Sequence, residues 1–261
     1  MSGEKGVGVM NDVPQRDILG IPVVALQWQA ALELVAARIH TNHFTKIAWL
    51  NAHCANVSQA DSDYRQILND FLILPDGIGV DIASRVLHGR SFPDNLNGTD
   101  FVPALLRFIE EPLRVGLLGA KSEEVARACE NFKKQTPQHD IQVISDGFFD
   151  GTNEQAILEK LAQFRPHILL VAMGVPRQEL FIAQAITDAH CVAAFAVGAL
   201  FDFQAGTAKR APSWMRQLRM EWLYRLIQEP QRLWRRYLVG NPLFLWHLLK
   251  YRLRLKGNNN G

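Results

Sequence analysis

The chain has 261 residues, of which 48% are hydrophobic, so it is long enough for one large α/β domain with an additional segment. Its net charge of +2 hides two unequal parts, because residues 207–261 carry twelve Lys or Arg and two acids, whereas residues 1–206 carry sixteen and twenty-four. An acidic body with a basic end predicts an anionic partner at that end. The scattered Cys54, Cys129 and Cys191 argue against a disulfide framework or thiolate zinc site and favour a reducing compartment.

The N-terminal residues show no signature of export or membrane insertion. Met1 to Asn11 lack the apolar run of a signal peptide, and no stretch approaches the roughly 20 apolar residues of a spanning helix. Residues 1–16 are rich in glycine and polar residues, which predicts a disordered start. We therefore expect a cytoplasmic protein that is not freely soluble at its C-terminal end.

The rest of the chain alternates between helix and strand patterns. The first half predicts a hairpin over Ile18–Leu26, a helix over Gln27–His40, a strand over Ile47–Leu50, a helical stretch to Asp70, a strand over Phe71–Leu74, and helices over Val80–Leu87 and Asp100–Ile109. The second half predicts strands over Arg114–Leu118, Ile141–Ser145, His167–Met173 and Val192–Val197, with a helix after the N-cap Ser122 and helices over Asn153–Phe164 and Gln178–Ala189.

This alternation predicts βαβ units. The expected fold class is α/β: a Rossmann-like, mostly parallel sheet with helices on both faces over residues 17–206. Residues 207–261 are expected to form a helical appendage of three basic, aromatic segments, interrupted by Pro212, Pro230 and Pro242.

The most informative stretch is Phe71–Val80, which reads FLILPDGIGV. Four apolar residues predict a short buried strand, a proline ends it, and an acid and two glycines follow. Asp76 is thereby placed at the mouth of a sheet, where open α/β folds bind ligands. The glycines allow backbone to approach a ligand closely. A carboxylate at this place can take a proton from a bound hydroxyl, so Asp76 is the candidate general base.

Three later strand ends also carry glycine and polar residues. Gly119 ends a strand and opens a helix, which presents free N–H groups to phosphate, although a tight turn explains it equally. Gly174, Gln178 and Glu179 follow another strand, with surface capping as the alternative, and Asp202 follows the last strand between aromatic residues. Together these ends predict a nucleotide-shaped crevice. Neither a GxGxxG nor a Walker pattern is present, so a dinucleotide or ATP site is not indicated.

Other polar residues leave a functional and a structural interpretation open. Asn51 is a candidate for binding a sugar or base, or for capping a helix. His53 is a candidate acid or ligand, although a single His near a strand end is more often structural. Asn97–Asp100 predicts a turn with Thr99 or Asp100 as the next N-cap.

The segment Asp61–Asp63 matches the DxD pattern that holds a metal–diphosphate in many sugar transferases. It lies in a polar helical stretch rather than at a strand end, so a solvated helix face is the preferred interpretation. No HExxH, GxSxG or clustered His/Cys spacing occurs. We expect no metal site and no cofactor.

The basic end interleaves arginine with large aromatic and aliphatic residues over Lys209–Lys256. Asn241–Lys256 is apolar first and basic later, which is typical of a helix at a membrane interface. Nucleic acid is the rival polyanion, but the bases fall among large aliphatics rather than on a polar face, so no nucleic-acid partner is expected. A helical hairpin packed on the core is the remaining alternative.

Five motifs, in this order along the chain, together resemble the bacterial glycosyltransferase family 26: LPDGIGV, NGTDFVPAL, MGVPRQE, GALFDFQAG and APSWMRQLRMEWLYRLIQEPQRLWRRY. The likeness runs from about Ile18 to Tyr237. It implies an inverting, metal-independent transfer of a sugar from a UDP-sugar donor to an undecaprenyl-diphosphate-linked saccharide acceptor at the cytoplasmic membrane face, in the assembly of cell-surface or exopolysaccharide. The family pattern also suggests self-association of the body.

The resemblance assigns roles to particular positions. The family's proposed base falls on Asp76, the asparagine after its first long strand on Asn51, its GxPxQE glutamine on Gln178, and its late acid on Asp202. Its C-terminal appendage, thought to close over the active site at the membrane, matches the arginine-rich end.

Cations from this appendage are expected to stabilise the leaving UDP or to hold the acceptor diphosphate. The candidates are Arg219, Arg225 and Arg232.

Two positions depart from the family pattern. Many relatives carry Thr where this chain has Trp49, and Arg where it has Asn95, so the identities of donor and acceptor stay open. Two other classes of function remain: a UDP-binding regulatory module without a base, and a nucleic-acid-binding protein that uses the basic end. The first would bind UDP without turning over a UDP-sugar, and the second would bind RNA or DNA with steep salt dependence.

Overall fold

The computed structural model describes residues 13–149, 151–217 and 220–258. An eight-stranded sheet lies at its centre, in the order β1-β2-β4-β3-β8-β7-β5-β6. The strands are β1 Gln15–Ile18, β2 Ile21–Val24, β3 Thr45–Leu50, β4 Phe71–Pro75, β5 Arg114–Gly119, β6 Asp140–Ser145, β7 Ile168–Ala172 and β8 Ala193–Ala196. Only β1, which forms a hairpin with β2, is antiparallel to its neighbour. The central strands are continuous apolar runs because helices cover both faces.

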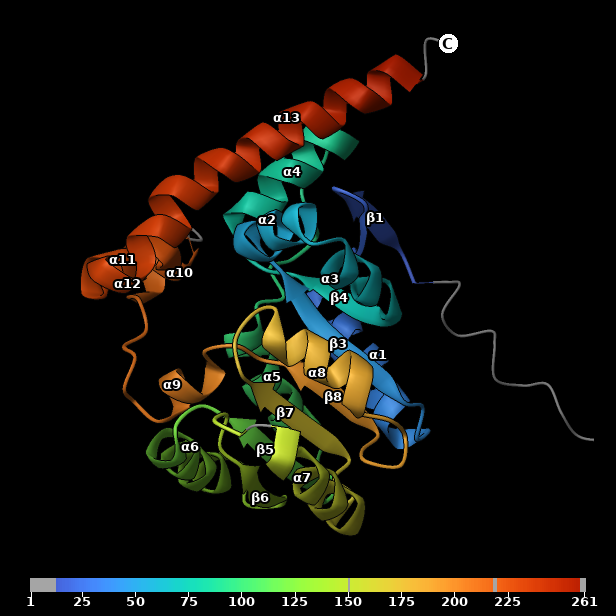
Figure 1. Cartoon of the computed structure of the whole chain (residues 1–261), viewed down its shortest axis with the longest axis vertical. Coiled ribbons are helices and arrows are strands. Elements are labelled where there is room, and N and C mark those ends of the chain that lie inside the picture. Colours follow the sequence, from blue (N-terminus) through green and yellow to red (C-terminus); the bar gives the residue numbers. More distant parts are fainter. Residues whose placement is uncertain (1–12, 150, 218–219, 259–261) are drawn as a thin grey trace, which may run out of the picture.

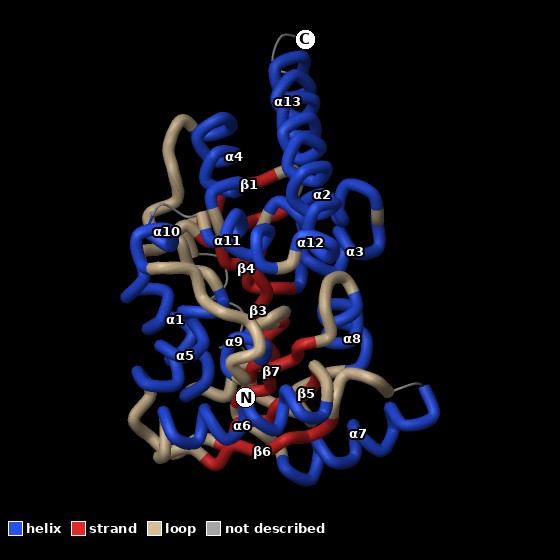
Figure 2. Tube along the Cα trace, turned by 90° about the vertical axis from the view of Figure 1, so that its left-hand side faces the viewer, coloured by secondary structure: helices blue, strands red, loops and turns tan. Residues whose placement is uncertain are grey.

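The body helices form two layers (Figures 1 and 2). Their bounds are α1 Trp28–His40, α2 Ala52–Ala60, α3 Ser62–Ile67, α4 Ile78–His88, α5 Gly98–Phe108, α6 Ser122–Gln135, α7 Gly151–Phe164, α8 Arg177–Ala185 and α9 Leu200–Gln204. Helices α1, α5, α6 and α9 pack on one face of the sheet, and α2, α3, α4, α7 and α8 pack on the other. The α/β class with helices on both faces is therefore confirmed.

The pleat of the strands divides the apolar residues between these two layers. In β3, Ile47 and Trp49 face the α1–α5 side, while Ala48 and Leu50 face the α2–α4 side. The same alternation continues through β4. Because strands β2–β8 run parallel to one another, they all end at the same edge of the sheet, and the loops that follow them meet there.

The start of the fold differs from the sequence prediction. Strand β1 begins at Gln15, so residues 15 and 16 are ordered in a sheet rather than part of a disordered start. The Arg16 guanidinium is buried and donates hydrogen bonds to the Ser84 hydroxyl and the Arg90 and Ser91 carbonyls, which anchor the strand. Residues 1–12 of that predicted segment lie outside the described residues.

Two predicted helix caps are wrong. Helix α5 is capped by Asn97, whose side chain accepts from the Asp100 N–H, and not by Thr99 or Asp100. Helix α6 begins at Ser122 itself, and the Ser122 hydroxyl donates to the Asp146 carboxylate instead of capping.

The predicted helical stretch before β4 is broken at Asp61. The Asp61 carboxylate accepts from the N–H groups of Asp63 and Tyr64 and so caps α3. The first acid of the DxD pattern is therefore engaged with the backbone.

The C-terminal segment is helical, as predicted. The sequence also predicted a break at Pro242, but the helix continues through this residue. It contains α10 Ser213–Gln217, α11 Glu221–Gln228, α12 Pro230–Trp234, a π-helical turn Arg235–Val239 and α13 Gly240–Asn258. Pro242 lies inside α13, directly after the π-helical turn. There the ladder already departs from the α-helical pattern, which accommodates a residue without an N–H.

Helix α13 runs along the body and lies over α2 and α4 (Figure 1). Phe244 and Leu248 are 1% and 3% exposed and extend the core of the α2–α4 layer. The Tyr251 hydroxyl donates to Asp17 at 2.7 Å, which ties the far end of α13 to the β1 hairpin. Among the described helices, none has both the length and the apolarity to cross a membrane.

Candidate active site

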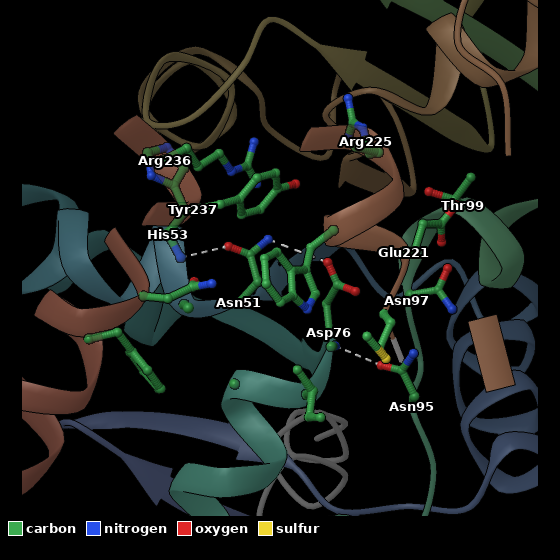
Figure 3. Close-up of a pocket in the computed structure, with 18 of the residues that line it drawn as sticks. Asn51, His53, Asp76, Asn95, Asn97, Thr99, Glu221, Arg225, Arg236 and Tyr237 are labelled. Atoms are coloured by element: carbon green, nitrogen blue, oxygen red, sulfur yellow. Dashed lines mark hydrogen bonds between the residues drawn. The ribbon is translucent and has the colours of Figure 1, made fainter. Parts of the chain in front are cut away.

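The carboxylate of Asp76 lies at the mouth of the sheet, directly after β4. The Asp76 N–H donates to the Leu50 carbonyl at 2.9 Å, so the neighbouring strand fixes its backbone. The Asn51 side chain, at the end of β3, donates to Asp76 Oδ2 at 3.3 Å (Figure 3). Asn51 Oδ1 accepts from the N–H groups of His53 and Cys54 and so caps α2. Asn51 therefore caps α2, as one of the two interpretations predicted, and also contacts Asp76, while its binding of a sugar or base stays a prediction.

A glycine turn carries the chain from Asp76 into α4. Gly77 has φ +89°, a conformation that favours glycine, and its N–H donates to Asn95 Oδ1 at 2.8 Å. Asn95 belongs to the loop before α5, so the motifs around Asp76 and Asn97 are joined by a hydrogen bond (Figure 3).

Two adjoining cavities meet at this point. One has a volume of about 480 Å³ and the other about 810 Å³. Seven residues line both: Asn51, His53, Asp76, Thr99, Phe203, Arg225 and Arg236. Asp76 and its hydrogen-bond partner therefore stand at the junction of the two spaces.

The two cavities have different walls. The smaller one extends between α4 and the C-terminal segment, where Ile78, Ile82, Phe244 and Leu245 make it apolar. The larger one follows the ends of β5, β7 and β8, and its wall is more polar than that of the smaller one, although Trp49, Val175 and Leu233 also line it. Its lining includes Ala120, Ala172, Gly174, Gln178, Glu179, Gly198 and Asp202. The arrangement suits an apolar or amphipathic ligand on one side and a polar ligand on the other.

Burial raises the pKa of Asp76 above its ordinary value of 3.8. The Asn51 hydrogen bond and the positive charges of Arg236 and Arg225 act against this rise, while Glu221 adds to it. The result is a carboxylate that is more basic than usual, as proton abstraction requires. By contrast, burial and the charge of Arg236 lower the pKa of His53 to about 4, so His53 is neutral near pH 7.

Gln178 and Glu179 lie together at the start of α8. Gln178 Oε1 accepts from the Gly198 N–H at 3.0 Å, and its amide donates to Glu179 Oε1 at 2.8 Å. Both side chains are almost fully buried, at 2% and 1% exposed. Burial raises the pKa of Glu179 to about 7. Its Oε2 has no hydrogen-bond partner in the described structure. The alternative of a surface cap is excluded, because both side chains are buried, line the larger cavity and join the ends of β7 and β8.

Comparison with known proteins agrees with this geometry. The model of the glycosyl transferase WecG/TagA/CpsF family matches residues 16–258. The chain belongs to this family. It is therefore a glycosyltransferase, and the resemblance drawn from its motifs is confirmed.

Two relatives of this glycosyltransferase are named N-acetylglucosaminyldiphosphoundecaprenol N-acetyl-beta-D-mannosaminyltransferase. The protein from Bacillus subtilis (strain 168) is 34% identical over 206 residues, which is 78% of each chain. The protein from Staphylococcus aureus (strain MW2) is 26% identical over 245 residues, which is 92% of this chain and 94% of the relative.

The remaining strand-end residues of this glycosyltransferase occupy different places. Gly174 and Asp202 line the larger cavity, and burial raises the pKa of Asp202. Gly119 instead packs against the backbone of β7, where a Cβ would lie 2.3 Å from the Ala172 carbonyl oxygen. Its neighbour Ala120 lines the cavity.

Among the predicted arginines, the structure brings two to the site. Arg225 lines both cavities, lies 5.1 Å from the Phe203 ring and has a buried Nε without a hydrogen-bond partner in the described structure. Arg232 lines the larger cavity and pairs with Glu229 at 2.7 Å. Arg219 lies outside the described residues.

Sequence reasoning missed Arg236. It lines both cavities, its buried Nε also has no hydrogen-bond partner in the described structure, and its charge acts on both Asp76 and His53 (Figure 3). The available signal was its spacing, because Arg236 follows Arg232 by four residues and so lies on the same helical face.

The two departures from the family pattern lie next to each other. Trp49 is 7% exposed, and its indole N–H donates to the Leu96 carbonyl. Its ring covers Gly98, where a Cβ would lie 3.1 Å from the indole. Trp49 thus holds the loop that carries Asn95 against the sheet. Trp49 lines the larger cavity and Asn95 the smaller one, so each helps to shape one of the two cavities.

No group of three or more His, Cys, Asp or Glu side chains arranged to hold a metal ion occurs among the residues that the structure describes.

Proposed function

We propose that this protein transfers a sugar, with inversion and without a metal ion, from a UDP-sugar to an undecaprenyl-diphosphate-linked saccharide. The reaction takes place on the inner face of the cytoplasmic membrane. The observation that carries the proposal is the position of Asp76 at the junction of two cavities, the smaller with an apolar wall and the larger with a more polar lining, with Asn51 donating to its carboxylate.

The reaction is a single displacement. The acceptor hydroxyl oxygen attacks the anomeric carbon of the donor, and Asp76 takes the hydroxyl proton as the new C–O bond forms. The bond between the anomeric carbon and the β-phosphate oxygen breaks, and UDP leaves with the bonding electrons. The proton on Asp76 then passes to solvent. Attack from the face opposite to UDP inverts the anomeric configuration.

The larger cavity is assigned to the donor. It lies at the strand ends of an open α/β sheet, where nucleotides bind in such folds. Buried polar groups at its wall, the Gln178–Glu179 pair and Asp202, are suited to the hydroxyl and amide groups of a nucleotide and sugar.

Charge that develops on the leaving diphosphate is stabilised by Arg225 and Arg236. Both reach the junction beside Asp76, and each has a guanidinium Nε that is buried without a hydrogen-bond partner in the described structure. Fixed cations in a water-poor site stabilise a developing anion strongly, because they need no reorganisation when the charge appears.

The smaller cavity is assigned to the acceptor. Its apolar wall comes from α4 and the membrane-facing C-terminal segment, which suits the first part of a polyprenyl chain next to a diphosphate and sugar. The names of both relatives include an undecaprenol-linked N-acetylglucosamine, which supports a lipid-linked acceptor here.

The test is UDP release from a panel of UDP-sugars with lipid-linked mono- and disaccharides, with product mass and anomeric configuration as readouts. Asp76→Asn should reduce kcat about 10²–10⁴-fold while UDP binding stays within about twofold. The matched control is Asp70→Asn, which changes an exposed acid directly before β4, at the opposite end of the strand from Asp76. Turnover by Asp76→Asn close to that of the control would remove Asp76 as the base. A product with retained configuration would remove the single displacement.

A further inference from the structure

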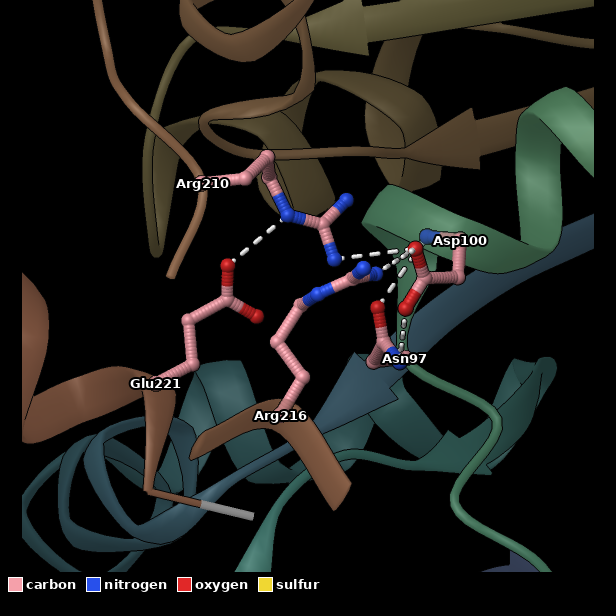
Figure 4. Close-up of polar contacts among 5 residues, drawn as sticks. All are labelled: Asn97, Asp100, Arg210, Arg216 and Glu221. Carbon is pink, nitrogen blue, oxygen red and sulfur yellow. Dashed lines mark hydrogen bonds and ion pairs between the residues drawn. The ribbon is translucent and has the colours of Figure 1, made fainter. Parts of the chain in front are cut away.

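Arg210 lies at the centre of a cluster of charges between the body and the C-terminal segment (Figure 4). Its Nε donates to Glu221 Oε1 at 2.8 Å, at the start of α11. Its Nη2 donates to Asp100 Oδ1 at 2.9 Å, in the first turn of α5. Arg216 approaches the same Asp100 oxygen at 3.7 Å. One guanidinium therefore joins two helices that lie far apart in the sequence.

Arg210 stands behind the wall of the active site. Its partners Asp100 and Glu221 line the smaller cavity, whereas Arg210 is absent from the described lining of both cavities. The guanidinium of Arg210 also lies 5.3 Å from the Phe203 ring, and Arg225 lies 5.1 Å from the same ring. Phe203 and Arg225 both line the two cavities. Arg210 therefore contacts the same ring, Phe203, that holds Arg225 at the junction.

The charged side chains of this cluster are largely shielded from water. The side chains of Arg210 and Glu221 are 26% and 25% exposed, and that of Asp100 is 35% exposed. The surface pair Arg127–Glu123 has a distance of 4.0 Å and side chains that are 61% and 88% exposed, so water screens it far more. Breaking a shielded pair leaves an uncompensated charge, which is more damaging than losing a solvated one.

Arg210 also neutralises the negative charge of two carboxylates in the cavity wall. Without Arg210, the cavity wall would present the carboxylates of Asp100 and Glu221 to an anionic donor and a diphosphate-linked acceptor. Arg216 would remain as a counter-ion for Asp100, but Glu221 would have no ion-pair partner left among the described residues. An uncompensated Glu221 would also act more strongly on Asp76.

We propose that Arg210 is a positioning residue of this glycosyltransferase, which fixes α11 over the active site and neutralises the acidic wall where the diphosphates bind. The inference rests on the proposed function, because it assumes that anionic substrates occupy the two cavities. Arg210 touches no substrate; it acts through Asp100, Glu221 and Phe203.

The first measurement is steady-state kinetics of Arg210→Met, Arg210→Lys and Lys209→Met. Lys209 is the matched control because it is exposed, next to Arg210 and carries the same charge. Arg210→Met should lower kcat/KM at least about tenfold, mostly through a higher KM for both substrates. Arg210→Lys, which keeps the charge but loses the planar fork, should recover only part of this loss. Lys209→Met should stay within about twofold of the unchanged protein.

The second measurement asks whether the unpaired acid causes the loss. Glu221→Gln combined with Arg210→Met should recover at least about threefold of the activity lost in Arg210→Met, because it removes the uncompensated carboxylate. A purely structural role for Arg210 predicts that the double variant is no better than the single one.

The third measurement is the pH profile. The charged or titratable groups that share a cavity with Asp76 are His53, Cys54, Asp100, Glu179, Asp202, Arg216, Glu221, Arg225, Arg232, Arg235, Arg236 and Tyr237. Arg210→Met leaves Glu221 uncompensated, so the acid limb of kcat/KM should move to higher pH. Adding Glu221→Gln should move it back. A limb that stays in place in both variants would overturn the electrostatic part of the proposal.

Hydrogen exchange without substrate separates this inference from the proposed function. In Arg210→Met the amides of Glu221–Gln228 should exchange at least about threefold faster than in Lys209→Met, whatever reaction the protein catalyses. If the unchanged protein turns over no UDP-sugar but this difference appears, the proposed function fails and the positioning role stands. If UDP-sugar turnover is present and Arg210→Met matches Lys209→Met in kinetics and exchange, the positioning role is wrong.

Discussion

The edge of the sheet and the C-terminal segment hold their functional groups in different ways. At the sheet edge, Asp76 is placed by a backbone hydrogen bond to Leu50 and by the Asn51 amide, which itself caps α2. In the C-terminal segment, Arg225 and Arg232 are placed by contacts between side chains, with Phe203 and Glu229. The proposed base is therefore fixed by the fold, whereas the proposed cations depend on how the segment packs against the body.

The two regions also differ at their surfaces. Of the fifteen large hydrophobic side chains that are exposed in the described structure, eleven belong to residues after 206 and four to the body. Two of those four, Ile78 and Ile82, line the smaller cavity. A body that hides its apolar residues and a basic segment that exposes them are what a protein working at a membrane interface requires. On the proposed function, the body therefore supplies most of the chemistry and the C-terminal segment supplies the contact with the membrane.

Apart from Asp76→Asn, the largest effect should come from removing a cation at the junction of the two cavities. Arg236→Met should reduce kcat about 10²–10³-fold, because Arg236 faces the place where the leaving diphosphate acquires charge. The measurement is kcat for UDP release at saturating donor, together with UDP affinity by calorimetry. Arg127→Met, which removes an exposed arginine of α6, is the control and should change neither value. Loss of UDP affinity with unchanged kcat would mean that Arg236 contributes to nucleotide binding and does not stabilise the transition state.

A smaller effect is expected at the sheet edge. Asn51→Ser keeps an oxygen that can cap α2 but loses the amide that donates to Asp76. We expect kcat to fall about tenfold, as for the loss of one hydrogen bond to a charged group. Because the variant keeps a cap, its melting temperature should change little.

Asn51→Ser should also shift the pH dependence of kcat/KM in a defined direction. Burial holds the pKa of Asp76 above its ordinary value of 3.8, and activity is lost as the pH falls through that raised value because the base becomes protonated. The Asn51 amide lowers the pKa, so removing it should move the acid limb of kcat/KM to higher pH. A limb that moves to lower pH would show that Asn51 does not act on the ionised carboxylate.

The sequence predicted the body of this protein well because its signals are local. The apolar runs of β3, β4, β5, β7 and β8 and the glycine turn after Pro75 are visible without any knowledge of neighbours. The order of the sheet is not visible, since β8 lies between β3 and β7 although it comes last in the chain. Asn97 was missed as a cap because Thr99 and Asp100 are equally good capping residues by type.

The site was predicted in part for the same reason. Strand ends identify Asp76, Asn51 and Gln178, because each follows an apolar run. The choice among twelve basic residues of the C-terminal segment depends on which of them the tertiary packing turns toward the sheet. That packing rests on Phe244 and Leu248, which are buried although the neighbouring leucines are exposed. Hydrophobicity alone does not show which of these apolar residues face the body.

The smallest predicted effect concerns the exposed face of α13. Phe244, Leu248 and Tyr251 point to the body at spacings of four and three, which leaves Trp246, Leu249 and Leu253 on the other side, 60%, 50% and 60% exposed. Trp246→Ser should weaken binding to vesicles containing phosphatidylglycerol by a few-fold, because a tryptophan at the headgroup level contributes apolar area and a polar N–H. Phe148→Ser is the control on the body, where the side chain is 74% exposed. Equal loss of vesicle binding in both variants would show that α13 is not the membrane-facing element, whereas a loss confined to Trp246→Ser, with unchanged turnover of a short-chain acceptor, would separate location from chemistry.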